Sequence, residues 1–351
     1  MTILGLALGS FANVLIYRLP RGESIVQPPS HCPGCNREIG ALENVPVLSW
    51  LFLRGHCRTC RSPISVRYPL IEIAGGELAI VAVRLFGLSY ASFAYCLLFI
   101  ALLALVIIDL ESWLLPFAIT VPLAIIGLTG AIFFHLRPLA DSLLGLVVGG
   151  AVLAGIGGLG NVLFRRRRQQ YPADEIDDAA ADEPDSRSLA LPYAVTLGIM
   201  IAAVAGSFLV RLNSVTSGWS YVLYGALPFV VVALLYRWAF RPRKSTSAHD
   251  SVAFGKASEE IGEELKDAGS MGGGDIVFGM MAGVFLGWKL VLLMTFMASF
   301  LGTFLALLFV VMRINIRDLK IQFGPLLAVS ALVCLLIGDS IIGWYIAFLT
   351  G

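Results

Sequence analysis

Long hydrophobic runs, each about as long as a helix that crosses a membrane, alternate with short polar segments along the chain. A window of about 20 residues, the length that spans the core of a bilayer, finds ten such runs. They are residues 3–19, 69–88, 92–110, 115–134, 141–164, 190–211, 219–240, 275–288, 290–312 and 325–349. The pattern predicts an all-α polytopic membrane protein with about ten transmembrane helices.

The run at 275–288 differs from the others because it is short and is interrupted by Gly279, Gly283 and Gly287. Small residues at this spacing allow the backbones of two membrane helices to approach closely. We therefore expect this helix to tilt or to pack closely against a neighbour.

Basic residues fall in loops that lie on one side of the membrane if the chain starts outside. These loops are the cysteine-rich segment near the start, residues 165–168, residues 241–244 and residues 313–320. The opposite loops are short and poor in Lys and Arg. By the positive-inside rule the basic side is cytoplasmic, and both termini are expected outside.

Composition agrees with a chain surrounded by lipid. The protein has 351 residues, of which 58% are hydrophobic and 14% are charged, and its mean hydropathy is +0.83. The net charge of +1 carries little information because the charges are segregated into loops. We expect a lipid bilayer as partner and no nucleic acid.

Four cysteines near the start form two CxxC pairs, Cys32 with Cys35 and Cys57 with Cys60. Four thiolates at this spacing suit a closed tetrahedral zinc site, because each tight turn brings two sulfurs to one ion. Two disulfides or four unrelated thiols are the alternatives. The surrounding arginines favour the reducing cytoplasmic side and hence a metal. We predict a small cytoplasmic zinc hairpin in which His31 and His56 are bystanders.

Two carboxylates stand at the ends of apolar runs. Asp109 ends the third run, and Asp275 opens the eighth, directly after Gly272, Gly273 and Gly274. A charged side chain near hydrocarbon costs at least about 2.5 kcal/mol, so it is rarely placed there without use. In the topology above both carboxylates lie at cytoplasmic helix ends, although the spacing does not show that the two helices are adjacent.

Paired carboxylates can hydrolyse a peptide bond when one, ionised, takes a proton from water and the other, protonated, donates to the carbonyl oxygen. The three glycines before Asp275 would let the backbone approach a substrate strand or adopt a positive φ. Two alternatives remain. Asp275 can be an ordinary N-cap and Asp109 an interface residue, or both can form the ion or proton site of a transporter that the zinc hairpin regulates.

Further motifs run in a fixed order through residues 1–164 and 270–351. They are residues 9–14 (GSFANV), 17–20 (YRLP), 44–50 (NVPVLSW), 53–55 (LRG), 64–65 (IS), 67–69 (RYP), Glu72, Asp109-Leu110, Gly272 to Asp275, and Phe323-Gly324-Pro325. With the four cysteines, these segments resemble the type IV prepilin peptidases, the membrane aspartyl proteases that process type IV pilins and type II secretion pseudopilins.

The resemblance implies that Asp109 and Asp275 are the catalytic pair. It implies as substrate a prepilin or pseudopilin, whose basic leader is cut after a glycine at the cytoplasmic face of the bacterial inner membrane. It also implies that many members methylate the new N-terminal amine with S-adenosylmethionine, and that the cysteine hairpin is linked to that cytoplasmic domain. Proteolysis itself would need no cofactor.

The chain departs from the family pattern in three places. Phe117 and Val277 stand where the family usually has Asp and Lys, so an opposite-charge pair is absent, and residues 165–268 form an insertion with two extra helices and polar linkers. The expected parts are a first transmembrane helix (1–19), a cytoplasmic zinc-binding domain associated with methyl transfer (20–68), a membrane core with Asp109 (69–164), the insertion (165–268) and a membrane core with the glycine motif (269–351).

Overall fold

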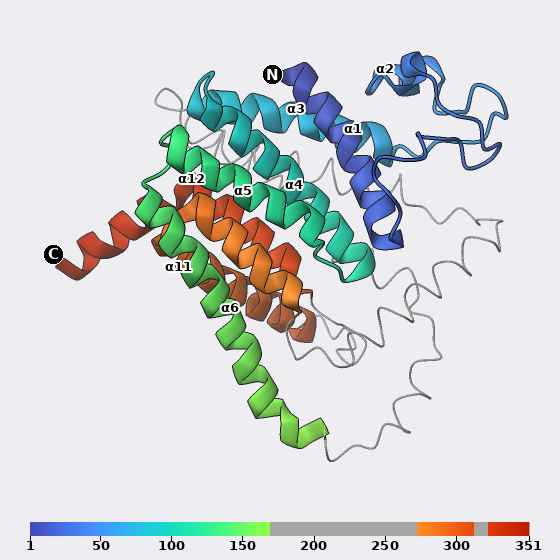
Figure 1. Ribbon diagram of the computed structural model, residues 1–351. Coiled ribbons are helices and arrows are strands. Elements are labelled where there is room, and N and C mark those ends of the chain that lie inside the picture. Colours follow the sequence, from blue (N-terminus) through green and yellow to red (C-terminus); the bar gives the residue numbers. More distant parts are fainter. Residues whose placement is uncertain (169–271, 312–321, 351) are drawn as a thin grey trace.

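The computed structural model describes residues 1–168, 272–311 and 322–350. This part of the chain is helical, with two isolated bridges and no strand (Figure 1). The elements are α1 (Thr2–Arg18), η1 (Leu19–Arg21), η2 (Ala41–Asn44), α2 (Leu48–Phe52), α3 (Arg67–Phe86), α4 (Tyr90–Ser112), α5 (Phe117–Phe133), α6 (Leu139–Arg168), α11 (Gly273–Val311) and α12 (Phe323–Thr350). The prediction of an all-α protein is confirmed for these residues.

The hydrophobic runs predicted the helices well, but the count of ten spans is not confirmed. Two runs, 190–211 and 219–240, lie outside the described residues, as does nearly all of the segment 165–268. Among the described helices, α1, α4, α6, α11 and α12 are long and apolar enough to cross a membrane, and α5 is a shorter apolar helix. These helices make the chain a multi-pass membrane protein.

The long element α11 consists of two helices that meet at a break. Gly287 has φ 77° and ψ 170° there, a conformation that side chains rarely adopt. A Cβ added to Gly302 would lie 3.1 Å from Leu326 of α12, so the second half of α11 packs along α12. The break confirms that the runs 275–288 and 290–312 are separate helices.

The first half of α11 packs against α6 through direct backbone contact. A Cβ added to Gly283 would lie 2.0 Å from the carbonyl oxygen of Gly145, and one added to Gly279 would lie 2.7 Å from that of Gly149. The pair α6 and α11 forms the most extensive helix contact among the described residues. The expectation that this glycine-rich helix packs closely against a neighbour is therefore confirmed.

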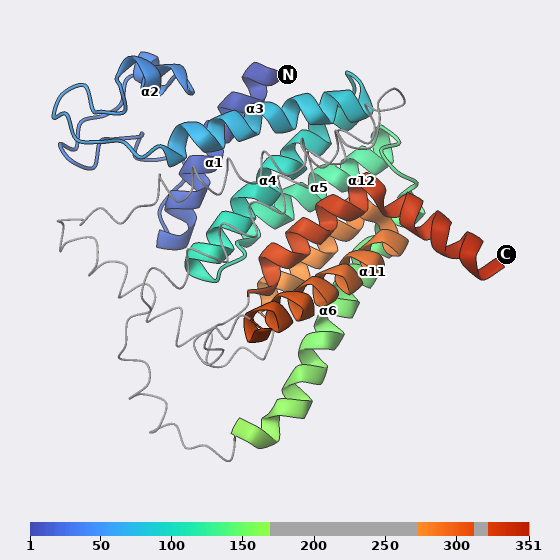
Figure 2. The ribbon, with the colours of Figure 1, turned by 180° about the vertical axis from the view of Figure 1, so that it is seen from behind.

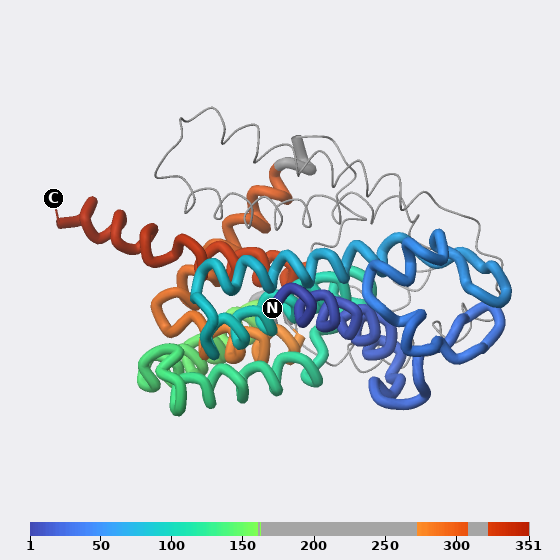
Figure 3. Tube along the Cα trace, turned by 90° about the horizontal axis from the view of Figure 1, so that it is seen from above, coloured from blue at the N-terminus to red at the C-terminus, as the bar shows by residue number. Residues whose placement is uncertain are grey.

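A second glycine contact joins α1 to α3, which lie side by side (Figure 3). A Cβ added to Gly5 would lie 2.4 Å from the carbonyl oxygen of Gly75, and one added to Gly9 would lie 2.8 Å from that of Ile71. The backbones therefore approach each other closely at Gly5, Gly9 and Gly75, which side chains at these three positions would prevent.

Helix α4 lies at the centre of the bundle, and 78% of its apolar window is buried. Its N-terminus is fixed by a capping box, in which Ser89 and Ser92 exchange side-chain hydrogen bonds with each other's backbone N–H. The segment between α1 and α3 extends from one end of the bundle, and the last turns of α12 extend from the other (Figures 1 and 2).

The contact between α6 and α11 generates a stability prediction. Gly145→Ala places a Cβ 2.1 Å from the carbonyl oxygen of Gly283, so the helices must separate, at a cost of roughly 1–3 kcal/mol. Thermal unfolding in detergent should show a lower midpoint for this variant. The control is Gly155→Ala in the same helix, where a Cβ would meet nothing within 4 Å. Equal midpoints for the two variants would contradict the assigned packing.

Candidate active site and metal centre

Asp109 lies in the last turn of α4 and is buried, with 6% of its surface exposed. The helix ends because Trp113 adopts a left-handed conformation, with φ 56°, and its N–H donates to the carbonyl oxygen of Asp109 at 2.8 Å. The following residues, Leu114 to Pro116, lead directly into α5. Asp109 therefore lies beside a tight connection between two helices.

Asp275 lies in the first turn of α11, where its N–H donates to the carbonyl oxygen of Gly272 at 3.2 Å. The preceding residue, Gly274, packs onto the connection that follows α4: a Cβ there would lie 2.8 Å from the Cβ of Leu115 and 2.9 Å from its carbonyl oxygen. The start of α11 thus lies against the end of α4, and the Asp275 carboxylate is within electrostatic reach of the Asp109 carboxylate.

The glycines before Asp275 were expected to provide close substrate approach or a positive φ, and the second of these reasons is wrong. None of Gly272, Gly273 and Gly274 is among the residues with positive φ. Steric crowding explains Gly274, because a side chain there would collide with Leu115. Cβ atoms on Gly272 and Gly273 would make only ordinary contacts, at 3.9–4.0 Å, so these two positions leave the approach to Asp275 uncrowded.

The two departures from the family pattern meet at the same helix junction. The ring of Phe117, at the start of α5, lies 3.9 Å from the position of a Cβ on Gly273. Val277 follows Gly273 by one turn of α11 and so lies on the same face of that helix. The two positions that depart from the family pattern therefore lie at one junction between α5 and α11.

The beginning of α12 completes this junction. Gln322 donates its side-chain amide to the carbonyl oxygen of Asp109 at 2.9 Å, and Gly324 packs directly against the Asp109 carboxylate. Neither residue was predicted from the sequence to belong to the site. The available signal was the motif Phe323-Gly324-Pro325, which carried part of the family resemblance but no assigned role.

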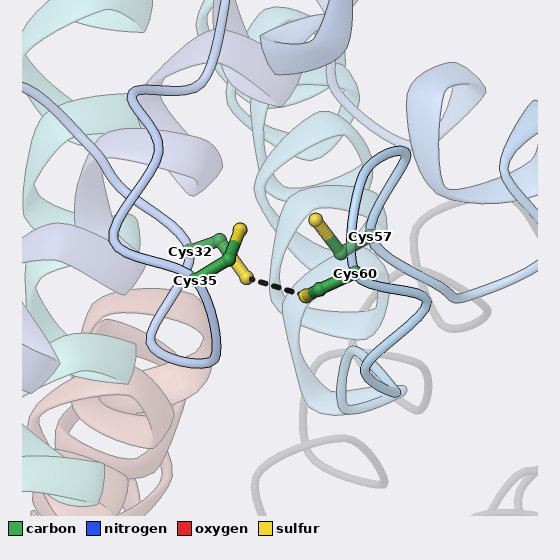
Figure 4. A group of neighbouring side chains, drawn as sticks. All are labelled: Cys32, Cys35, Cys57 and Cys60. Carbon is green, nitrogen blue, oxygen red and sulfur yellow. Dashed lines mark hydrogen bonds between the residues drawn. The ribbon is translucent and has the colours of Figure 1, made fainter.

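The four predicted metal ligands come together in the segment between α1 and α3. The sulfur atoms of Cys32, Cys35, Cys57 and Cys60 all lie within 4.8 Å of one another. Figure 4 shows that two separate loops bring their side chains toward a common point. None of the four is in a disulfide. The disulfide alternative is therefore not found, and the four thiols can hold a metal ion.

The two loops that carry the cysteines have the same backbone conformation. The N–H of Cys32 donates to the backbone carbonyl oxygen of Arg37, and the N–H of Cys57 donates to that of Ser62. In both loops the acceptor lies five residues after the cysteine. The residue after each second cysteine, Asn36 or Arg61, has a positive φ of 56° or 59°. Two copies of one tight turn therefore face each other and present two sulfurs each.

The spacing of the sulfurs fits a tetrahedral ion. With Zn–S bonds of about 2.3 Å, the sulfurs of a tetrahedral site lie about 3.8 Å apart, and the sulfurs of Cys32 and Cys60 are 3.7 Å apart. Desolvation opposes ionisation of Cys32, but hydrogen bonds from Ser62 and from the backbone at Gly34 and Cys35 lower the pKa of this thiol to about 6. At Cys35 a backbone hydrogen bond from Arg37 favours ionisation, but desolvation and the three neighbouring thiols outweigh it and raise the pKa to about 11, so without a metal ion the four sulfurs do not all ionise together. The thiolate is the form that binds metal.

Glu43 ties the two cysteine loops together. Its carboxylate forms an ion pair with Arg37 of the first loop and a 3.4 Å ion pair with Arg58 of the second. Desolvation opposes ionisation of Glu43, yet the hydrogen bond and charge of Arg37 outweigh it and hold the pKa of Glu43 below its usual value. Glu43 was not predicted from the sequence, because a single acid among arginines forms no distinctive pattern.

Three contacts attach this hairpin to the membrane helices. The side chain of Asn13 donates to the carbonyl oxygen of Tyr68 at 3.1 Å, and the N–H of Val47 donates to Glu72 at 2.7 Å. Arg67 binds both carboxylate oxygens of Glu111, at 2.5 and 3.2 Å. Because Glu111 follows Asp109 by two residues, this ion pair joins the base of the hairpin to the helix end that carries Asp109.

Two family models match the chain. The Bacterial Peptidase A24 N-terminal domain matches residues 3–86, and the Type IV leader peptidase family matches residues 182–307. The second match includes Asp275 and begins within the segment 165–268, so the interpretation of that segment as an insertion stays a prediction. No solved structure matches the chain.

Curated relatives carry one name, prepilin leader peptidase/N-methyltransferase. The protein of Myxococcus xanthus is 44% identical over 42% of this chain and 44% of its own length. That of Aeromonas hydrophila is 28% identical over 98% of this chain and 92% of its own length. That of Stutzerimonas stutzeri is 33% identical over 62% of this chain and 82% of its own length. The chain therefore belongs to the prepilin leader peptidase/N-methyltransferase family.

Proposed function

We propose that this protein is an aspartic endopeptidase that cleaves the leader of type IV prepilins or type II secretion pseudopilins. The packing of Gly274 on Leu115, which brings Asp275 and Asp109 from distant parts of the chain to one helix junction, is the observation that carries the proposal. Membership of a family whose curated members are named prepilin leader peptidases supports the same substrate class.

Hydrolysis needs one proton acceptor and one proton donor on opposite sides of the reaction. The acceptor carboxylate takes a proton from water as the water oxygen attacks the scissile carbonyl carbon, and the donor protonates the carbonyl oxygen. Collapse of the tetrahedral intermediate breaks the C–N bond as the carboxyl that took the proton from water passes it to the leaving nitrogen. The other carboxylate takes back a proton from a hydroxyl of the intermediate, so both groups return to their starting states and the cycle needs no cofactor.

Helix dipoles distinguish the two roles. Asp275 lies in the first turn of α11, where the positive end of the dipole favours a charged carboxylate, so we assign it as the base. Asp109 lies in the last turn of α4, where the negative end of the dipole favours the protonated form, so we assign it as the acid.

The cytoplasmic face is the proposed location of this chemistry. The arginine-rich hairpin extends from the same end of the bundle as Asp109, to which Arg67 and Glu111 connect it. Basic loops stay in the cytoplasm, and a basic prepilin leader would lie there too. The bacterial inner membrane is the corresponding location.

Methylation of the new N-terminal amine is a second proposed activity, because the relatives' name includes N-methyltransferase. The ion pair between Arg67 and Glu111 would keep the hairpin close to the site where that amine is released. The methyl donor would be S-adenosylmethionine.

We predict that Asp109→Asn and Asp275→Asn each lower prepilin cleavage by roughly 10²- to 10⁴-fold or more, because an amide can serve as neither acid nor base. Purified variants are incubated with prepilins in detergent, and leader release is measured. A transporter that uses the same carboxylates would leave the leader intact in the parent protein as well.

The matched control for these variants is Asp339→Asn. Asp339 is another carboxylate in an apolar helix, but it lies 15 residues beyond Gly324 in α12, roughly 20 Å away along the helix. Its replacement should leave cleavage unchanged. Substantial activity in either Asp109→Asn or Asp275→Asn would remove that residue from the catalytic pair.

Zinc is the ion that we propose for the four thiolates. Protein purified without chelator should contain about one zinc per chain, and Cys57→Ser should lose it, because a closed tetrahedral site tolerates no missing thiolate. Elemental analysis measures the metal content, and limited proteolysis of residues 20–66 reports on the fold of the hairpin. Cys96→Ser, in the core of α4, should retain the metal. A metal-free parent protein would exclude this proposal.

A further inference from the structure

The N-terminal end of α12 contacts both the carboxylate and the backbone of Asp109. An added Cβ on Gly324 would lie 2.3 Å from Oδ2 of Asp109 and 3.0 Å from its Cγ. These distances are too short for any real Cβ atom, so the carboxylate occupies the space that every other residue at position 324 would fill. The position of the carboxylate in the structure therefore depends on glycine.

The nature of the crowding atom decides what a side chain at position 324 would do. At Gly274 an added Cβ would meet the backbone of Leu115, which cannot move without shifting a helix connection. At Gly324 the closest atom is the free end of the Asp109 side chain, which can rotate away. A small side chain at position 324 would thus displace the carboxylate and leave the helices in place.

Gln322 contacts the backbone of Asp109, whereas Gly324 contacts its carboxylate. Its side-chain amide donates to the carbonyl oxygens of Asp109 at 2.9 Å and of Leu110 at 3.4 Å. These carbonyls lie in the last turn of α4, where the helix itself offers no complete set of donors. The Asp109 carbonyl also accepts from the N–H of Trp113, so Gln322 adds a second donor there and links the end of α4 to the start of α12.

The chain between these two contacts is short and rigid. A single residue, Phe323, separates Gln322 from Gly324, and Pro325 follows at the start of α12. Proline fixes its own φ, and its missing N–H is not needed in the first turn of a helix. The backbone contact and the carboxylate contact are consequently made by one inflexible segment.

We propose that Gln322 and Gly324 are positioning residues that hold the Asp109 carboxylate in register with Asp275. This inference rests on the proposed function, in which the two carboxylates exchange protons with the same substrate. Neither positioning residue is assigned contact with the substrate. They act through Asp109, and misplacement of a reacting group by about 1 Å can reduce a rate by roughly 10²-fold.

The first test is Gly324→Ala in the full-length protein, assayed for prepilin cleavage. We expect kcat to fall roughly 10- to 100-fold, with KM changed by less than about twofold. The pH profile of kcat should also change shape, because the distance between two interacting carboxylates sets how they titrate as a pair. Gly343→Ala is the matched control in the same helix, since a Cβ there would meet nothing within 4 Å.

A second variant tests the backbone contact independently. Gln322→Glu has the same shape but no amide donor for the carbonyls of Asp109 and Leu110, and it should lower kcat by roughly 3- to 10-fold. Gln322→Lys keeps a donor on a long side chain and should recover part of that loss. If Gly324→Ala fails to fold, the comparison of these two variants decides the proposal by itself.

The possible outcomes separate the positioning role from the catalytic pair. Retention of parental kcat in Gly324→Ala or in Gln322→Glu would overturn the proposal. A lower yield of active protein with unchanged KM and an unchanged pH profile would also overturn it, because that result indicates a purely structural role. Activity of Asp109→Asn in the same assay would instead refute the proposed function, whatever the result for Gly324.

Discussion

Direct contact between helix backbones, which glycine alone permits, is the interaction on which the rest of the structure depends. Lipid tails are as apolar as leucine, so burial of apolar side chains gives membrane helices little reason to pair, and close van der Waals packing takes its place. The α6–α11 pair meets through Gly145 and Gly283, and the α1–α3 pair meets through Gly5 and Gly75. The first pair orients the helix that carries Asp275 in its first turn, and the second holds together the two helices that flank the cysteine hairpin.

The candidate active site is a meeting point of helix ends and not a cavity within a single helix pair. Asp109 comes from the end of α4, Asp275 from the start of α11, and Gly324 from the start of α12. At each junction glycine allows one chain to lie against another: Gly274 against Leu115, and Gly324 against Asp109. Helix ends also expose unpaired N–H and C=O groups, so the same junction supplies dipoles and hydrogen-bonding groups in an otherwise apolar bundle.

Features that depend on local sequence patterns, such as helix positions, were predicted from the sequence. Contacts between segments that are far apart in the chain were not. Hydrophobic runs gave helix starts within two residues of the observed α1, α3, α4, α5, α6, α11 and α12, and loop charges put Asp109 and Asp275 at the same end. The contacts of Gln322 with α4 and the ion pairs of Glu43 were not foreseen, because each depends on which distant segment lies alongside. The positive φ expected for the glycines before Asp275 was wrong; what requires glycine at position 274 is crowding by Leu115, in the connection between α4 and α5.

The hairpin between α1 and α3 begins and ends at positions that the two helices already hold together. Asn13 of α1 donates to Tyr68 of α3, so the residues between them form a loop whose ends are closed by the bundle itself. Each doubling of the length of such a loop costs only about 0.6 kcal/mol. A domain of almost any size can therefore be gained, exchanged or lost at this junction while the helices keep their packing. The helices that flank the hairpin therefore place only a weak constraint on its length.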